Sequence, residues 1–384
     1  MPQPTLLQSL VIALIQVILV VILIFVIVPL TIFAERKVLG HLQQRLGSTR
    51  IAGTLTGLSG FLNRWMWRMG KVPVLSYWRG LPGLAGDVLK MILKEDVRPA
   101  KADRFVFFIA PALSFVAAVV VFGAISFAPG TLFTLPAWVP LVGGLPVAGA
   151  IADINVGLLW ILGFASVGVY GILLAGWASN SKYPLLGGLR SAAQIVSYEV
   201  PLTLSLLVPV LLSGSLSFGE LSRRMAVETG YAAILPQMVG FLLYLTCGFA
   251  ETNRTPFDMP EAENELVAGF HTEYSGMKFG FFYLAEYINM AVVSAIAAGF
   301  FLGGPWLLPY GLQGLWIPES VPFLGQPNVL FFLAKVVFLL FVYIWVRGTI
   351  PRYRYDQIMS VGWKYLIPLT LINLALAAGI RYFA

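Results

Sequence analysis

The sequence contains a single cysteine, Cys247, and only two histidines, His41 and His271, among its 384 residues. An iron–sulfur cluster is ordinarily held by four cysteines, and a structural zinc ion by four cysteine or histidine side chains. The chain lacks a ligand set for either group, so we expect it to bind no cofactor of its own. Any electrons that pass near it must belong to a partner's cofactor or to a diffusible molecule.

Charged residues are also scarce: they make up 11% of the chain, against 58% hydrophobic residues, and the mean hydropathy is +0.83. This composition has far more apolar surface than a soluble core can bury, and the apolar runs are long enough to cross a bilayer. The first run, at about 6–33, follows an N-terminus without basic residues and lacks a small-residue cleavage site. We therefore predict an all-α polytopic membrane protein in which this first run is retained.

The apolar runs predict eight transmembrane helices. No repeat at a fixed period is visible, so the sequence does not support an inverted-repeat transporter, and we interpret residues 1–384 as one membrane domain. The predicted spans lie at about 6–33, 105–127, 156–178, 195–212, 234–250, 279–302, 329–346 and 363–382.

The basic residues predict the side of the membrane on which each loop lies. Eight spans place both termini on one side, and 21 of the 25 Lys and Arg residues fall in the first, third, fifth and seventh connections with their flanks. The positive-inside rule therefore predicts that these connections are cytoplasmic and that both termini lie on the outer side.

The first connection carries 13 of these basic residues, between Arg36 and Arg104. Within it, residues 82–95 place charges at spacings of three and four opposite an apolar face, which predicts an amphipathic helix on the membrane surface. Residues 61–81 interleave tryptophans with basic residues, which is typical of an interfacial belt; a specific lipid or partner site is the alternative. Because the basic residues adjoin membrane segments, the net charge of +7 does not indicate nucleic-acid binding.

Three charged residues lie well inside predicted spans, away from the span ends: Glu199, Glu286 and Lys335. A charge near the bilayer centre costs roughly 2.5–3.5 kcal/mol on insertion scales, so both glutamates should face the protein interior or water. The alternative for Glu199 is a position close to the interface, where it is simply solvated. Lys335 either has a function within the membrane or extends its ammonium group toward the interface.

The segment ETNRTPFDMPEAENELVAGFHTEYSG, residues 251–276, gathers six of the 18 acidic residues beside one arginine, Arg254. If its second half is helical, Asp258, Glu261 and Glu265 lie on one face, at positions i, i+3 and i+7. Carboxyl groups at this spacing titrate as a coupled set when they are drawn into the protein. The segment therefore indicates a proton relay or a binding site, whereas a solvated acidic surface would couple these groups only weakly.

Five segments together resemble one family. They read ERKVLGHLQQRLG, LKEDVRPAKAD, SNSKYPLLGGLRSAAQIVSYEVPL, ETNRTPFDMPEAENELVAGFHTEYSGMKF and RGTIPRYRYDQIM, in this order over nearly the whole chain. They are similar to signature segments of the H subunit of bacterial NADH:quinone oxidoreductase, respiratory complex I, the counterpart of the mitochondrially encoded first subunit. The resemblance implies a multi-pass protein of the bacterial cytoplasmic (inner) membrane, part of a proton-translocating enzyme but without a cofactor of its own.

The resemblance also implies the partners of the chain. It would join the membrane arm of the complex to the peripheral arm, whose subunits bind NADH, FMN and the iron–sulfur clusters. Quinone, the substrate, would enter from the lipid bilayer into a chamber that the chain forms with subunits of the quinone module. Neighbouring membrane-arm subunits would pump the protons.

Carried over residue by residue, the resemblance implies three groups of side chains. The first lines or braces the quinone chamber: Glu35, Arg36, Asp87, Arg254 and Asp258. The second forms an acidic path toward the proton-pumping subunits: Glu199, Glu251, Glu261, Glu263, Glu265 and Glu286. The third lies at the junction of the two arms: Arg347, Arg352 and Asp356.

The resulting hypothesis is that quinone reduction changes the proton demand of the chamber, and that coupled carboxyl groups pass this change along the membrane arm. Two alternatives remain open on the sequence. A homologous membrane component of a membrane-bound hydrogenase or a ferredoxin-driven complex would share the fold but not the electron donor. A free-standing secondary transporter would function alone, and would be expected to show repeats and broken helices.

Overall fold

The computed structural model is predominantly helical. Its only sheet among the described residues is a two-stranded antiparallel hairpin of β1 (Thr131–Thr134) and β2 (Pro146–Ala148). The structure describes residues 5–45, 47, 64, 68, 80–136, 144–152, 154–228, 230–259, 266–309, 312–313 and 324–383.

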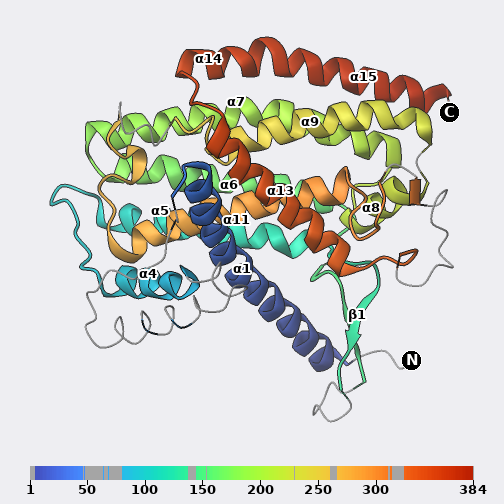
Figure 1. The fold of residues 1–384 in the computed structure, drawn as a ribbon, viewed down its shortest axis with the longest axis horizontal. Coiled ribbons are helices and arrows are strands. Elements are labelled where there is room, and N and C mark those ends of the chain that lie inside the picture. The colour runs from blue at the N-terminus through green and yellow to red at the C-terminus, as the bar shows by residue number, and fades with distance from the viewer. Residues whose placement is uncertain are drawn as a thin grey trace.

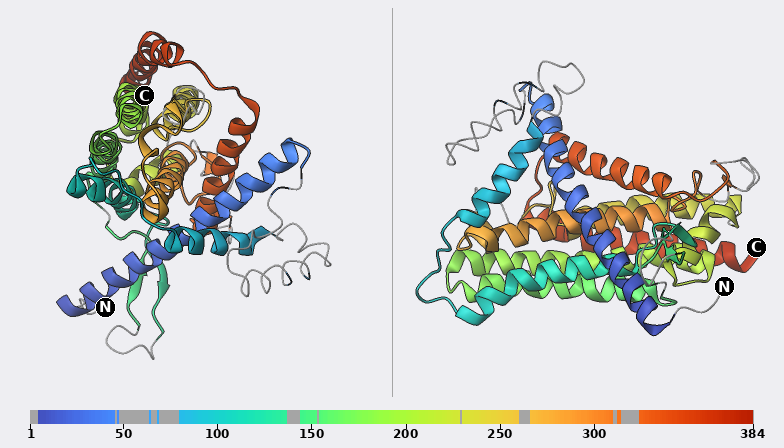
Figure 2. Two further views of the ribbon diagram at one scale, coloured as in Figure 1. Left: turned by 90° about the vertical axis from the view of Figure 1, so that its left-hand side faces the viewer. Right: turned by 90° about the horizontal axis from the view of Figure 1, so that it is seen from below.

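Eight helices in this described part of the chain are long and apolar enough to span a bilayer, which confirms the predicted polytopic all-α fold. Both termini lie at the same end of the helical bundle (Figures 1 and 2). The spanning segments are α1 (Leu6–Leu42), α5 (Arg104–Val121) with the 3₁₀ turn η2 (Phe122–Ala124), α6 (Gly157–Ala178), α7 (Lys182–Ser213), α9 (Ile234–Glu251) with η3 (Tyr231–Ala233), α11 (Gly276–Phe300), α13 (Val329–Thr349), and a last helix formed by α14 (Tyr355–Ser360), the π-helical η5 (Val361–Leu366) and α15 (Ile367–Phe383).

Several helices extend beyond the predicted spans. Helix α1 continues to Leu42 rather than ending near Phe33, and α7 begins at Lys182 rather than near Ile195. Apolar runs mark only the part of a helix that suits lipid, whereas the backbone hydrogen bonding continues into polar sequence.

Helix α11 is the most deeply buried of the spanning helices in the described part of the chain and organises the packing. It packs against α5, α9, α13 and α1, while α5, α6 and α7 follow one another as neighbours and α15 covers α7 (Figure 2). The core around α11 is rich in aromatic side chains, among them Tyr287, Phe300 and Phe332, each no more than 2% exposed. The polar residues of α11 must therefore find partners within the protein.

Helix α1 crosses the bundle diagonally, and its N-terminal half projects from it (Figures 1 and 2). At 37 residues it is about 55 Å long. The hairpin supports the projecting half: Val147 belongs to an apolar cluster with Ile12, and Gln16 Nε2 donates to the carbonyls of Ala148 and Ala150 at 3.2 and 3.0 Å. Gln16 thereby satisfies both protons of a buried amide with hairpin backbone.

Two shorter helices lie at opposite ends of the bundle (Figure 1). Helix α4 (Leu81–Leu93) is the predicted surface helix, and it presents Val88 and Ile92, both more than half exposed. Lys278 at the start of α11 forms an ion pair of 2.6 Å with Asp96 and so holds the segment after α4. Helix α8 (Phe218–Val227) lies near the end that holds the termini and was not predicted. The proposed aromatic belt at 61–81 falls largely outside the described residues.

Candidate functional site

A network of buried charges surrounds Glu35, where α1 contacts α11 and α13. The side chain of Glu35 is 8% exposed, and its carboxylate forms an ion pair with Arg347 of α13. Tyr287 of α11 donates its hydroxyl proton to Glu35 Oε2 at 2.7 Å, and Arg254 Nη1 lies 3.6 Å from Glu35 Oε1. Two cations and a hydroxyl donor thus offset the cost of burying this carboxylate.

Arg254 connects Glu35 to a second acid. It lies in the turn after α9, which Asn253 enters with a left-handed φ of 51°, and it is 5% exposed. Its Nε forms an ion pair with Glu286 of α11, and its guanidinium lies 4.2 Å from the centre of the Tyr287 ring. Burial opposes the charged form of Arg254, but the nearby Glu286 and Glu35 hold its pKa above the usual range. The guanidinium therefore stays charged. We call Glu35, Arg254, Glu286, Tyr287 and Arg347 the Glu35 network.

A cavity of about 80 Å³ adjoins the Glu35 network, between α5, α6, α7, α11 and the end of α9. Glu286 lines it, and so does Glu251, the last residue of α9. This volume is enough for a few water molecules, each of which occupies about 30 Å³ in the liquid. The remaining polar side chains of the wall are Ser114, Thr252, Asn253, His271, Tyr283 and Asn289.

Glu199 lies outside the wall of this cavity, although Ile195, one turn earlier on α7, is part of it. The Glu199 carboxylate accepts a hydrogen bond from the hydroxyl of Ser166 on α6. The side chain is partly buried in the middle of α7. Within the protein, Glu199 thus has a partner on a neighbouring spanning helix.

Asp258 does not belong to the Glu35 network but forms a separate ion pair with Arg352. It is 3% exposed, and Arg352 Nη2 donates to its Oδ2 at 2.9 Å. The backbone N–H of Tyr353 donates to the carbonyl of Pro256 at 3.1 Å, which joins the same two segments again. The loop after α9 is therefore fastened to the segment after α13. The other acids predicted for this loop, Glu261, Glu263 and Glu265, lie outside the described residues, as does the helical face expected to carry them.

Two further predicted residues form exposed pairs. Arg36 Nη1 lies 2.5 Å from Asp87 Oδ2, with side chains 41% and 44% exposed, and this pair bridges α1 and α4. Asp356 lies 3.6 Å from Arg354 and is 73% exposed. Such pairs contribute only about 0–1 kcal/mol to stability. Of the residues predicted for the quinone chamber, Glu35, Arg254 and Asp258 make buried contacts, whereas Arg36 and Asp87 form an exposed pair. The three residues predicted for the arm junction each pair with a different residue.

The aromatic and imidazole groups of this site were not predicted from the sequence. Tyr283 lines the cavity, and its hydroxyl oxygen lies 3.0 Å from that of Tyr287. The two tyrosines are one helical turn apart and close to Glu286 in the sequence. This spacing was the signal by which they could have been found. His271 also lines the cavity, and burial lowers its pKa to about 4, against an opposing effect of Asp258. The imidazole is therefore neutral at neutral pH.

Lys335 of α13 contacts backbone carbonyls in the connection that follows α11. Its ammonium group donates to the carbonyl oxygens of Leu302, Gly304 and Trp306, with a distance of 3.1 Å to Gly304. These residues lie in the turn that follows α11, which ends at Phe300. Lys335 therefore ties this turn to α13 through three backbone carbonyls.

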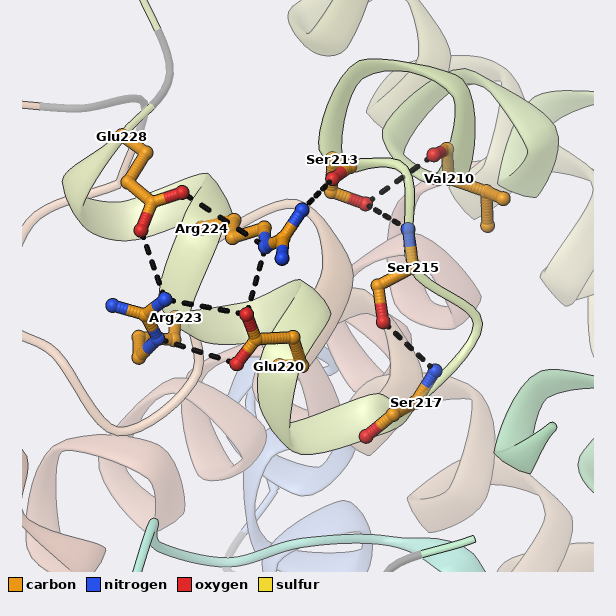
Figure 3. A network of polar contacts seen from close by, with 8 residues as sticks. All are labelled: Val210, Ser213, Ser215, Ser217, Glu220, Arg223, Arg224 and Glu228. Carbon is orange, nitrogen blue, oxygen red and sulfur yellow. Dashed lines mark hydrogen bonds and ion pairs between the residues drawn. The ribbon is translucent and has the colours of Figure 1, made fainter. Parts of the chain in front are cut away.

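A separate polar cluster lies on α8, near the end of the bundle that holds both termini (Figure 3). Glu220 Oε1 lies 3.2 Å from Arg223 Nη2 and 2.7 Å from Arg224 Nε. Hydrogen bonds from these two arginines hold the pKa of Glu220 below its usual range. Arg224 Nη1 also donates to the carbonyl of Ser213 at 2.8 Å, which caps α7. The cluster fastens α8 to the end of α7.

No group of three or more His, Cys, Asp or Glu side chains that could hold a metal ion occurs among the residues that the structure describes. Cys247, within α9, is fully buried. The polar groups that gather in this part of the protein are carboxylates, guanidiniums and phenols. Carboxylates and phenols can exchange protons, whereas guanidiniums balance charge without giving up a proton.

The chain is similar to known proteins over nearly its whole length. A family model described as NADH dehydrogenase matches residues 15–378. The first of the NADH-quinone oxidoreductase H subunits of Geobacter sulfurreducens is 44% identical over 361 residues, which cover 92% of this chain and 91% of the relative. The second H subunit of the same enzyme in Koribacter versatilis is 44% identical over 383 residues, 96% of each chain. NADH-quinone oxidoreductase subunit 8 of Rhodothermus marinus is 42% identical over 361 residues, 92% of each chain. The chain therefore belongs to the NADH dehydrogenase family.

Proposed function

We propose that the chain is a membrane subunit of a proton-translocating NADH:quinone oxidoreductase, and that it couples quinone reduction to proton translocation. The family and the names of the relatives support the assignment to this enzyme complex. The coupling role rests on one observation: Arg254 is a buried cation that bridges Glu35, from the predicted quinone chamber, and Glu286, from the predicted relay.

In this proposal the quinone chamber lies where α1, α4 and α11 meet. These three helices contact one another, and the Arg36–Asp87 bridge and the Tyr287–Glu35 hydrogen bond join them in pairs. Asp258 would brace the chamber from the loop after α9. Quinone reduction takes up protons, so it changes the charge that Glu35 experiences.

The shared cation would transmit this change. Arginine does not give up its proton in proteins, so Arg254 responds to a change at Glu35 through electrostatics alone. When Glu35 is neutralised, the guanidinium loses one of its counter-charges and stabilises the ionised form of Glu286 more strongly. The protonation of Glu286 then depends on events at Glu35.

The relay would begin in the cavity. Glu286 and Glu251 both line it, and a few water molecules between them would carry protons from one carboxyl group to the other. Glu199 would extend the path along α7, and Glu261, Glu263 and Glu265 would extend it in the loop. Protons would then pass to neighbouring membrane-arm subunits, which do the pumping.

Arg347 and Arg352 would serve the junction of the two arms by holding Glu35 and Asp258, the partners they have in the structure; Asp356 would lie on the surface beside them. Partner subunits would supply NADH, FMN and the iron–sulfur clusters. The distribution of basic residues supports a junction on the cytoplasmic side of the cytoplasmic membrane, with both termini outside. The common location of both termini at one end of the bundle supports this topology.

The test is Glu286→Gln in the intact complex, reconstituted into liposomes. We expect NADH:quinone activity and proton pumping both to fall roughly a hundredfold or more, the lower end of the effect of losing a proton-transfer group. Glu228→Gln on α8, at the other end of the bundle, is the matched control and should leave both rates unchanged. Normal NADH oxidation and normal pumping in Glu286→Gln would refute the relay.

A second experiment tests the electron donor. Proteins that copurify with the chain in mild detergent are identified by mass spectrometry, and we expect a flavin-bearing NADH module among them. A nickel–iron active-site protein in its place would overturn the assignment to an NADH-driven complex.

A further inference from the structure

Two connections join the cavity to Glu35 among the described residues. The first passes from Glu286 through Arg254 to Glu35. The second passes from Tyr283 in the cavity wall through Tyr287 to Glu35. The two connections share both ends but differ in chemistry.

The first connection carries charge effects but no protons. A guanidinium is always protonated and has no acceptor site, so it cannot receive a proton from one side and release one on the other. Arg254 is fixed in this state by two carboxylates and by the face of the Tyr287 ring. A proton that travels between the cavity and Glu35 along described residues needs the second connection.

The second connection is a chain of three oxygen groups with a single direction. Tyr287 donates to Glu35 Oε2 at 2.7 Å, which uses its only proton. The 3.0 Å contact between the two hydroxyls is therefore donated by Tyr283 and accepted by Tyr287. The oxygen of Tyr283 can then accept a hydrogen bond from water in the cavity that it lines.

We propose that Tyr283 and Tyr287 form a proton-conducting pair that joins the polar cavity to Glu35, independently of the acidic loop at 260–265. When Glu35 takes up a proton, the O–H bond of Tyr287 breaks and a new O–H bond forms on Glu35. Tyr287 takes the proton of Tyr283, and Tyr283 takes one from the cavity. Each phenol is neutral before and after, no electrons are exchanged, and one proton moves from the cavity to Glu35.

The packing around the pair suits this role. Tyr287 is 2% exposed, and its ring is held between the Arg254 guanidinium and the Tyr283 ring, whose centre is 4.9 Å away. Both tyrosines lie on the rigid, deeply buried α11, which keeps the hydroxyl distance short. Protein packing therefore excludes bulk water from the Tyr287 hydroxyl, and proton exchange there must use the two groups bonded to it.

This inference rests on the proposed function, and it is tested in the intact complex with Tyr287→Phe and Tyr283→Phe. Each change keeps the ring and removes one hydroxyl. We expect proton pumping linked to quinone reduction to fall roughly a hundredfold or more in each variant, while NADH oxidation by ferricyanide, a water-soluble acceptor, is unchanged. The double variant should be no slower than either single variant, because the chain is already interrupted.

Tyr244→Phe is the matched control. Tyr244 is fully buried on α9, and its hydroxyl donates to the carbonyl of Val293 at 3.2 Å, so the change removes a buried hydrogen bond without interrupting the pair. A structural effect would slow the control and the test variants alike. A proton-transfer effect would also raise the solvent deuterium isotope effect on pumping in Tyr287→Phe and Tyr283→Phe, but not in the control.

Three results would overturn the inference: normal pumping in Tyr287→Phe, additive losses in the double variant, or an unchanged isotope effect in both test variants. The proposed function fails by a different result. If Glu286→Gln is impaired while both tyrosine variants are normal, only the proton-conducting pair is wrong. If Glu286→Gln is normal, the relay itself is wrong.

Discussion

Glu35 of α1 and Arg347 of α13 form an ion pair between two helices that are far apart in the sequence. One residue further along α13, Gly348 accommodates α1 closely: a Cβ there would lie 2.6 Å from Cδ1 of Leu42. A charge pair and a close approach thus fix the same end of α1. The two partners differ in burial: the Glu35 side chain is 8% exposed and the Arg347 side chain 30%.

Replacing Arg347 with methionine should destabilise the protein by about 1–3 kcal/mol, because the carboxylate of Glu35 stays buried while one of its cations is lost. Thermal unfolding of the complex in detergent measures this as a lower midpoint. Arg354→Met is the matched control, since the Arg354 side chain is 81% exposed. Equal shifts in both variants would contradict the stabilising role of the pair.

His271 should make the protein labile to mild acid. Burial lowers its pKa from 6.5 to about 4, so between these values the unfolded state binds more protons than the folded state. The stability that His271 contributes is then complete above about pH 6.5 and decreases as the pH falls toward 4, by about 2 kcal/mol at pH 5. The unfolding midpoint of His271→Gln should fall less than that of the unmodified protein between pH 7.5 and pH 5. The same pH dependence in both proteins would exclude this explanation.

Lys335→Met should loosen the turn that follows α11. The change leaves carbonyl oxygens of three residues without their shared donor, at a cost of about 1–3 kcal/mol. Hydrogen–deuterium exchange in detergent should increase at residues 301–306 and remain unchanged in α1. Arg381→Met, which removes an exposed cation from α15, is the control. Unchanged exchange at 301–306 in Lys335→Met would show that these hydrogen bonds do not stabilise the turn.

Gly187→Ala should disturb the cavity wall. A Cβ at Gly187 would lie 2.8 Å from the backbone of Gly269 and Phe270, next to His271, so one segment must move. We expect a loss of about 1–3 kcal/mol in stability, measured by thermal unfolding. Gly163→Ala on α6 is the control, because no atom lies within 4 Å of its added Cβ; it should stabilise the protein by up to about 1 kcal/mol. A neutral Gly187→Ala would show that this contact is not tight.

The sequence predicted the spanning helices well because an apolar run of bilayer length has few alternatives. The ends of these helices were predicted less well, because charged residues were taken to mark them. Helix α1 was expected to end near Phe33, yet it continues through Glu35 and Lys37, which are 6% and 4% exposed. Glu35 is held by contacts with α11 and α13, which local hydropathy along the sequence does not include. The same holds for Lys335, whose carbonyl partners lie about 30 residues away.

Within the spanning helix α11, the residues of the candidate site were predicted only where a charge interrupted the apolar run. Glu286 was recognised for this reason, whereas Tyr283 and Tyr287 were not, because tyrosine is unremarkable in a spanning helix. Their importance depends on tertiary structure: α1 brings Glu35 to within hydrogen-bonding distance of a residue 252 positions later. No sequence pattern in α1 or α11 indicates that these two helices contact each other at Glu35 and Tyr287.

The length of α1 has a consequence for the lipid around the protein. Its apolar part, residues 6–33, is about 42 Å long, while the hydrocarbon layer of a bilayer is about 30 Å thick. The helix must therefore tilt, and a tilted helix responds to membrane thickness. The hairpin holds one end through Gln16, and Arg347 holds the other through Glu35. A thicker bilayer would reduce the tilt of α1 and strain these two attachments. Lipid composition would therefore affect the position of the Glu35 carboxylate, which accepts the hydrogen bond from Tyr287.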